Sequence, residues 1–494
     1  MMRQSGILMH ITSLPGPYGV GTMGAEARRF VDFLKQSGQS LWQILPLTPT
    51  GYGDSPYQSC SAYAGNAYLI DLDTLIDEGL LEPADITGIR WSEREDKADF
   101  GKLYNHRTSV LKKAFSRSRE DAAYEAFCHR NAYWLEDYCL YMALKQQHGG
   151  KPWYQWELPL KKRMPDAVEN ARAILHEGMR FHRFIQYIFH RQWEALRDYA
   201  HASGIHIIGD VPIYVPLDSC DVWSEPDLFE LDAELTPLRV AGCPPDAFSE
   251  DGQLWGNPLY RWDVHKADGY RWWIRRMAGA GNRYDIIRID HFRGFESYWA
   301  IPFGDATAKN GSWVKGPDME FLSALKAALP NVRMIAEDLG YLTQEVIDMK
   351  EASGYPGMKV LQFAFDPREP SDYRPHTYTA NSVCYTGTHD NATTRQWFEE
   401  ADAESLAYAE DYLKRPEEET FVRCMIRTAM ESISDTCVIP MQDYLELGKE
   451  ARMNQPGTCT PQNWTWRADA DYITPELTQQ ILSLTKDSDR TTKN

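Results

Sequence analysis

The chain repeats one plan from end to end: an amphipathic stretch, a Gly or Pro break, and a short apolar run that ends in polar or charged residues. Apolar residues at helical spacing indicate a helix, and a short apolar run between turn residues indicates a buried strand. About eight such runs are present. They lie at 7–11, 41–45, 205–208, 284–289, 332–336, 357–365, 382–386 and 437–441.

About eight strands that alternate with helices predict an α/β protein whose parallel strands close into a (β/α)₈ barrel, the TIM barrel. An open, doubly wound sheet predicts the same alternation, so the pattern is compatible with both architectures. In either fold, functional side chains gather at the carboxyl ends of the strands. The polar residues that end the apolar runs therefore mark the expected position of a site.

Two intervals interrupt this alternation. The first, residues from about 64 to 177, is far longer than a normal connection and holds helical material at 124–145, so we expect an inserted helical subdomain. The second, from about 216 to 268, is rich in Pro, Asp, Trp and Gly. Because long loops are usually functional, we expect a loop-rich subdomain over the barrel mouth. We interpret residues 1–494 as one barrel unit with these two insertions.

Composition excludes several classes of partner. The net charge of −19 argues against nucleic acid, because affinity for polyanions comes mainly from Lys and Arg. No apolar stretch is long enough to span a bilayer, so we expect no membrane association. The nine cysteines include no Cys-x-x-Cys pair, which predicts neither a disulfide framework nor a zinc ribbon. We expect a cytoplasmic protein that acts on a neutral substrate.

A glycine pattern at 19–24, Gly-Val-Gly-Thr-Met-Gly, matches the dinucleotide-binding fingerprint. Pro15 and Pro17 separate it from the preceding strand, although the fingerprint requires a tight turn directly after the strand. The stretch 39–46 also lacks the acidic residue that would bind a ribose. A Walker A pattern and His-Glu-x-x-His are absent as well. We therefore expect no cofactor.

Four acidic residues, Asp210, Asp290, Glu337 and Asp390, follow four of the apolar runs. Glycoside chemistry needs such a set, since one carboxylate attacks or stabilises an oxocarbenium-like centre while a second, protonated carboxyl donates to the leaving oxygen. Each residue alone is compatible with an ordinary capping or surface acid. Clustered acids and histidines also bind Mg²⁺ or Zn²⁺. We expect no metal, because no close His-His ligand spacing accompanies these acids.

Arg288 precedes Asp290 by two residues on an extended segment, so both side chains should project to the same side. A neighbouring guanidinium favours the ionised carboxylate and lowers its pKa, as a carboxylate nucleophile requires. A structural ion pair at a strand end is an equally good interpretation of this stretch alone. His291 and His389 lie directly beside the acids in the sequence.

Four segments resemble the signature regions of the α-amylase superfamily, in the form found in the 4-α-glucanotransferase family, also called amylomaltases or disproportionating enzymes. The resemblance extends to three further segments and so covers nearly the whole chain. The segments are GDVPIYV (209–215), RIDHFRG (288–294), IAEDLG (335–340) and TGTHDN (386–391), with SPYQS (55–59), WGNPLY (255–260) and RMN (452–454).

The resemblance implies a (β/α)₈ barrel without a separate C-terminal β-domain. It implies transfer of an α-1,4-glucan segment to the 4-hydroxyl of an acceptor sugar by a retaining double displacement, with α-1,4-glucans or maltooligosaccharides as donors and glucose or maltooligosaccharides as acceptors. By this likeness Asp290 is the nucleophile, Glu337 the general acid/base and Asp390 the transition-state stabiliser. An α-1,4-glucan hydrolase and a catalytically silent glucan-binding barrel are the alternatives. All three acids are present, which argues against a silent barrel.

The loop from 242 to 255 is the part of the chain that we expect to limit attack by water. Within it, Ala247 stands where members of the family often carry an aromatic residue, a difference that bears on acceptor preference and on the formation of large rings. The substrate-binding residues implied by the resemblance, or expected from this loop, are Tyr57, Asp210, Phe248, Gln253, Trp255, Arg288, His291, His389 and Asn454.

Overall fold

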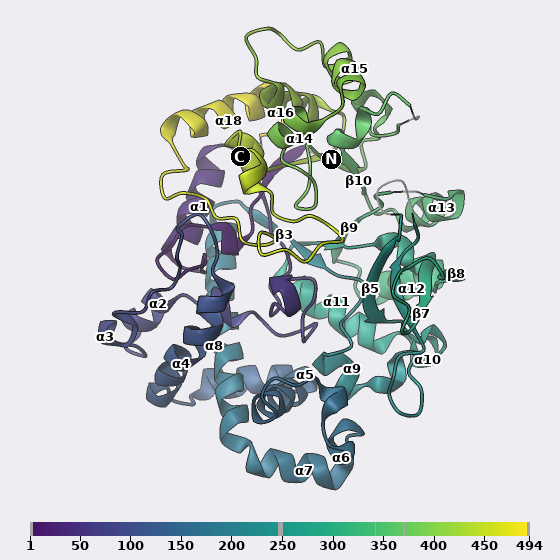
Figure 1. Ribbon diagram of the computed structural model, residues 1–494. Coiled ribbons are helices and arrows are strands. Elements are labelled where there is room, and N and C mark those ends of the chain that lie inside the picture. Colours follow the sequence, from purple (N-terminus) through teal and green to yellow (C-terminus); the bar gives the residue numbers. More distant parts are fainter. Residues whose placement is uncertain (1–2, 246–249, 341, 369–370, 492–494) are drawn as a thin grey trace.

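The computed structural model describes residues 3–245, 250–340, 342–368 and 371–491. Within these ranges eight parallel strands form a closed barrel (Figure 1). The predicted (β/α)₈ barrel is therefore confirmed, and the open doubly wound sheet is excluded. In their order around the barrel the strands are β1 (Gln4–Leu8), β2 (Leu41–Gln43), β3 (His206–Val211), β6 (Ile286–Ile289), β9 (Arg333–Ala336), β10 (Gly357–Val360), β11 (Ser382–Tyr385) and β12 (Thr436–Pro440).

All eight strands differ from the apolar runs by one or more residues at an end, and two of these differences have a clear physical reason. The first strand begins at Gln4, because the backbone of this polar residue pairs with Thr436 of β12, and backbone pairing does not require an apolar side chain. The run at 357–365 is strand only to Val360, after which residues Leu361–Ala364 form the 3₁₀ helix η7. Apolar residues in a short helix and in a buried strand cannot be told apart by periodicity alone.

Amphipathic helices cover the outside of the barrel. In α1 (Ala25–Gln36), for example, Ala27, Phe30, Val31 and Leu34 are buried, a spacing that places them on one helical face against the strands. No helix in the described ranges is both long and apolar enough to cross a bilayer. The other helices pack around the barrel, against its strands or against one another: α8 (His176–Ala202), α11 (Arg271–Arg283), α12 (Asp318–Ala328), α13 (Gln344–Ser353), α14 (Thr394–Glu400), α15 (Ala403–Leu413), α16 (Phe421–Glu431), α17 (Met441–Tyr444) and α18 (Pro475–Asp487).

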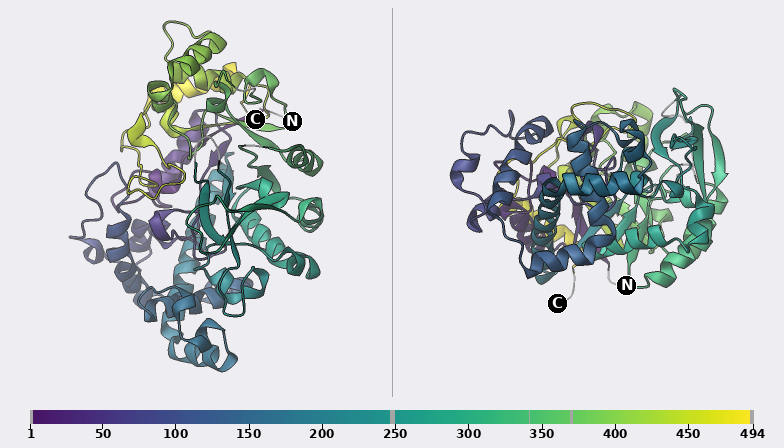
Figure 2. Two further views of the ribbon diagram at one scale, coloured as in Figure 1. Left: turned by 45° about the vertical axis from the view of Figure 1, so that its right-hand side comes forward. Right: turned by 90° about the horizontal axis from the view of Figure 1, so that it is seen from below.

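Between β2 and β3 the chain forms a group of helices that lies on one side of the barrel, blue in Figures 1 and 2. The long helix α5 packs along α8, where Arg183 forms an ion pair with Glu136 at 2.6 Å and Phe127 contacts Tyr187. The helices that precede α8 are α2 (Leu72–Asp77), α3 (Pro83–Ile86), α4 (Phe100–Arg117), α5 (Ala122–Gln147), α6 (Leu158–Lys161) and α7 (Pro165–Ile174).

A second, antiparallel sheet of order β5-β4-β7-β8 lies beside the barrel, to the right in Figure 1. Its strands are β4 (Arg239–Cys243), β5 (Gln253–Pro258), β7 (Ser297–Pro302) and β8 (Ser312–Lys315). The interval 216–268 thus contributes two strands, together with the short helices α9 (Cys220–Ser224) and α10 (Trp262–Ala267). The sequence pattern does not predict this sheet. Strands β7 and β8, which pair with β4 and with each other, lie outside that interval, and Gly256 and Pro258 within β5 disfavour strand structure.

Gly209 of β3 allows the ring of Tyr284 to approach the strand closely. A Cβ atom there would lie 2.2 Å from the ring of Tyr284, whose hydroxyl group accepts a hydrogen bond from the Leu47 backbone and is therefore held in place. We predict that Gly209→Ala lowers the free energy of unfolding by about 1–3 kcal/mol, as measured by urea denaturation, because the core is overpacked.

Gly178→Ala on α8 is the matched control, since the nearest atom to its added Cβ would be Ala143 Cβ at an ordinary 3.4 Å. This change should leave stability equal or raise it by up to about 1 kcal/mol, because Ala favours a helix. Equal urea midpoints for the two variants would contradict the packing argument.

Candidate active site

The register of three adjacent strands brings the acidic residues together. Between β3 and β6, Asp210 pairs directly with Arg288. The register between β6 and β9 continues to the last residue of both strands, so the residues that follow, Asp290 and Glu337, are neighbours as well. Paired residues of parallel strands project to the same side of the sheet. The carboxyl ends of β3, β6 and β9 therefore form one charged cluster, which fits the position expected for a barrel site.

Arg288 is the centre of this cluster. Its Nη1 atom lies 2.7 Å from Asp210 Oδ2 and 2.9 Å from Asp290 Oδ1, which confirms that Arg288 and Asp290 are neighbours. The Tyr57 hydroxyl group donates a second hydrogen bond to Asp210 Oδ2 at 2.9 Å, and Arg288 Nε donates to Met358 Sδ. Arg288 and Asp210 are both buried. A buried cation between two carboxylates avoids the large cost of an unpaired charge.

Asp210 has an unusual environment for a carboxylate. Burial raises its pKa to about 7, opposed by the positive charge of Arg288 and reinforced by the negative charge of Asp290. Its Oδ1 atom is buried and has no hydrogen-bond partner among the residues that the structure describes. An unsatisfied buried oxygen is rare in proteins and calls for a partner. A sugar hydroxyl group or a water molecule would satisfy it.

Glu337 is held by backbone groups from two loops. The His291 N–H donates to Oε2 at 2.6 Å, and the Leu339 N–H donates to Oε1 at 2.9 Å. Burial raises the pKa of Glu337 to about 7; Arg288 and both N–H groups lower it, whereas the charge of Asp290 raises it further. A carboxyl group that keeps a proton near neutral pH can act as a general acid. Glu337 has this property and lies next to Asp290.

Asp390 follows β11 and faces the cluster from another part of the barrel. Asn454 Nδ2 donates to its Oδ1 atom at 2.7 Å, and His389 Nε2 lies 3.4 Å from its Oδ2 atom. Burial lowers the pKa of His389, so this ring is neutral at neutral pH. The Asp390 side chain remains 39% exposed, and its carboxylate is thus oriented by neighbours yet open to a ligand.

Aromatic rings surround the carboxylates. Tyr57 stacks on His389 with centroids 5.2 Å apart, and Trp464 contacts both rings at 5.6 and 6.0 Å. On another side of the cluster, Trp255 meets His291 edge to face at 4.8 Å. Sequence reasoning missed Trp464, because it lies outside the recognisable motifs. It also missed the contact between Arg288 and Met358, which depends only on the barrel's three-dimensional form.

The remaining predicted residues fall into two groups. Gln253 Oε1 accepts a hydrogen bond from Trp255 Nε1 at 3.1 Å, so these two residues of β5 lie together beside His291. Phe248 and Ala247 lie outside the residues that the structure describes. The backbone N–H groups that hold Glu337 were not predicted, since no residue type signals which N–H will point into a site.

A closed parallel barrel with paired carboxylates at adjacent strand ends is characteristic of enzymes that cleave or transfer glycosides. A family model described as 4-alpha-glucanotransferase matches residues 9–472. The chain belongs to this family and is a glycosyl-transferring enzyme.

The relatives cover almost the full length of the chain. It is 46% identical over 482 residues to the 4-alpha-glucanotransferase of Clostridium butyricum, covering 97% of this chain and 99% of the relative. The Streptococcus pneumoniae enzyme of the same name is 48% identical over 488 residues, with coverages of 98% and 96%. The structure also resembles amylomaltase from Streptococcus agalactiae in complex with acarbose, with a TM-score of 0.96, 42% identity and coverages of 99% and 100%.

The raised pKa of Glu337 predicts a pH-dependent effect on stability. Between the pKa of an unfolded glutamate, about 4.3, and the folded value of about 7, the folded state binds more protons, so the free energy of unfolding falls as pH rises. Glu337→Gln removes this titration. We predict that the variant is more stable than the wild type at pH 8, on the order of 1–3 kcal/mol, and that the difference shrinks toward pH 5.

Urea denaturation at both pH values measures this difference. Glu351→Gln, which changes an exposed residue of α13, is the control and should give the same small effect at both pH values. A Glu337→Gln variant that is less stable than the wild type at pH 8 would contradict the burial of an ionised carboxylate.

Proposed function

We propose that this chain moves a segment of an α-1,4-glucan to the 4-hydroxyl group of an acceptor sugar by a retaining double displacement. The observation that carries the proposal is the pair of neighbouring carboxyl groups with different environments. Arg288 forms an ion pair with Asp290, whereas burial raises the pKa of Glu337 to about 7. One nucleophilic carboxylate and one protonated acid are the two groups that the reaction needs.

In the first step, Asp290 attacks the anomeric carbon of the donor while the glycosidic C–O bond breaks. Glu337 gives its proton to the departing oxygen, which leaves a covalent glucosyl–Asp290 ester and an ionised Glu337. The ion pair at 2.9 Å supports the role of Arg288, since it favours the anionic form of the nucleophile.

In the second step, Glu337 takes the proton from the acceptor 4-hydroxyl group as its oxygen attacks the same anomeric carbon and releases Asp290. Two inversions retain the configuration. Adjacent strands lie about 4.8 Å apart. This spacing supports a retaining mechanism, in which the two carboxyl groups lie about 5–5.5 Å apart and leave no room for water between them.

The other residues of the cluster bind the sugar at the cleaved bond. Asp390, oriented by Asn454, would accept hydrogen bonds from sugar hydroxyl groups and stabilise the transition state. The Oδ1 atom of Asp210, which has no partner within the described part of the chain, supports a hydrogen bond to the same sugar. The stacked rings of Tyr57 and His389 lie beside it. The insertions at about 64–177 and 216–268 flank this site in one catalytic unit.

The proposed donors are α-1,4-glucans and maltooligosaccharides, and the proposed acceptors are glucose and maltooligosaccharides. The structural likeness to amylomaltase in complex with acarbose supports this substrate class. We place the enzyme in the cytoplasm. The nine cysteines of the sequence include no Cys-x-x-Cys pair, which supports a reducing compartment.

Transfer to a sugar rather than to water requires an acceptor held close to the intermediate and a mouth that limits water. Trp255 and Gln253 lie beside His291 at this mouth and support such a role for β5. Hydrolysis is the alternative outcome of the same chemistry.

Incubation with maltotriose distinguishes the two reactions. We predict glucose together with maltodextrins longer than maltotriose, separated by chromatography, because the glucosyl-enzyme is captured by a second sugar. Maltose and glucose without longer products would indicate a hydrolase.

Substitution of the two carboxyl groups tests their roles. We predict that Glu337→Gln lowers the transfer rate from maltotriose by about 10²–10⁴, the usual contribution of a general acid. Asp290→Asn should reduce it at least as much, because no covalent intermediate forms. Product formation from maltotriose measures both rates.

A donor whose leaving group needs no protonation separates the role of Glu337 from that of Asp290. With α-glucosyl fluoride, Glu337→Gln should still form the glucosyl–Asp290 ester, seen by mass spectrometry, since fluoride leaves without protonation. Asp290→Asn should form none. Near-normal transfer from maltotriose in either variant would refute the assignment.

A further inference from the structure

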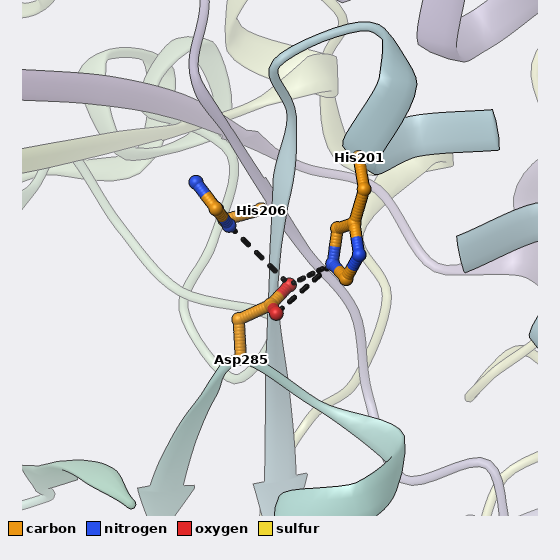
Figure 3. A group of neighbouring side chains, drawn as sticks. All are labelled: His201, His206 and Asp285. Atoms are coloured by element: carbon orange, nitrogen blue, oxygen red, sulfur yellow. Dashed lines mark hydrogen bonds and ion pairs between the residues drawn. The ribbon is translucent and has the colours of Figure 1, made fainter. Parts of the chain in front are cut away.

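A second cluster of potential ligands lies at the opposite end of the barrel from the carboxylates. It consists of His201 in the last turn of α8, His206 at the start of β3 and Asp285 immediately before β6 (Figure 3). Asp290 follows the other end of β6, five residues after Asp285 along an extended chain, which corresponds to about 16 Å. The cluster is therefore separate from the site described above.

The three side chains point toward one another, as Figure 3 shows. His201 Nε2 lies 2.9 Å from Asp285 Oδ1 and 3.0 Å from Oδ2, and His206 Nδ1 lies 3.8 Å from Oδ2. One ligand atom from each residue lies within 4.8 Å of the others. Ligands at about 2.0–2.2 Å from a tetrahedral ion lie about 3.3–3.6 Å apart. Small side-chain rotations would thus bring all three atoms to bonding distance.

The barrel holds the carboxylate of this cluster in place. Asp285 Oδ2 accepts a hydrogen bond from the Ile207 N–H at 2.7 Å, and the Asp285 N–H donates to the Ile207 carbonyl at 3.0 Å. Asp285 is therefore a positioned ligand with its second-shell contact already formed.

The imidazole rings are accessible from solvent. The side chains of His201 and His206 are 37% and 49% exposed, whereas Asp285 is 21% exposed. An ion can reach the cluster without opening the fold, and water can complete its coordination. The net charge of −19 also favours cations near the surface.

We propose that His201, His206 and Asp285 bind a divalent transition-metal ion of the Zn²⁺ class. Two imidazole nitrogens and one carboxylate oxygen suit Zn²⁺, Co²⁺, Ni²⁺ or Cu²⁺, whereas Mg²⁺ and Ca²⁺ prefer oxygen ligands. The ion joins the end of α8 to the amino ends of β3 and β6. It stabilises the barrel and takes no part in the reaction, because the carboxylates lie at the other end of these strands.

Isothermal titration with Zn²⁺ tests the proposal on tag-free, chelator-treated protein. Because Cys459 is exposed and thiolates bind zinc, the titrations use a Cys459→Ser background. We expect one equivalent of Zn²⁺ to bind per chain, and His201→Ala or His206→Ala to weaken binding by more than about tenfold. His129→Ala, which removes an exposed histidine of α5, is the matched control and should leave binding unchanged.

Thermal unfolding and activity give independent measurements. Zn²⁺ at about a hundredfold excess over Kd should raise Tm by about 2–3 °C in the background protein and not in His201→Ala. Transfer from maltotriose should be the same for the background protein and both histidine variants, which also shows that the variants are folded. Zn²⁺ binding of equal strength in the His201→Ala/His206→Ala double variant, or no binding in the background protein, would overturn the proposal.

Discussion

The buried guanidinium group of Arg288 is the interaction on which the site depends. It lies inside a closed barrel, where an unpaired charge would cost several kcal/mol, and it is paired with Asp210 from β3 and Asp290 after β6. The parallel register places Asp210 directly beside it. The pairing of β3 with β6 within the barrel therefore also neutralises this cation. The second ion pair of Arg288 holds the Asp290 carboxylate at the point where a donor sugar would be attacked.

The different environments of the neighbouring acids follow from this arrangement. The charges of Arg288 and Asp290 shift the pKa of Glu337 in opposite directions. Burial therefore determines the direction of the net shift, and the pKa of Glu337 rises to about 7. Asp290 retains the direct ion pair. Two neighbouring carboxyl groups thus have different environments, one in a direct ion pair and one buried with a raised pKa, which is how a single fold can supply two carboxyl groups of different character. As a consequence, the buried carboxyl group of Glu337 destabilises the fold when it ionises.

The strands β3 and β6 carry different chemistry at their two ends. At the carboxyl ends lie the acids and Arg288, and at the amino ends lie His206 and Asp285. A rigid strand separates the two groups by its own length, so contacts that stabilise the barrel at one end do not disturb geometry at the other. His201 of α8 and Asp285 before β6 complete the group at the amino ends, far along the chain from Asp390, which follows β11 and completes the group at the carboxyl ends.

Three features can be predicted from sequence: the alternation of helices and strands, the acids at the strand ends, and the Arg288–Asp290 pair. They depend on hydrophobic periodicity and on the two-residue repeat of side chains along a strand, which are local properties of the chain. The strand pattern alone left closure open, because closure depends on β1 pairing with β12 across more than four hundred residues, and only the family resemblance implied it. Only the tertiary structure decided which backbone N–H groups hold Glu337, that Trp464 joins Tyr57 and His389, and that His201 and His206 meet at Asp285. Each of these contacts joins distant segments, and no local pattern records which segments will meet.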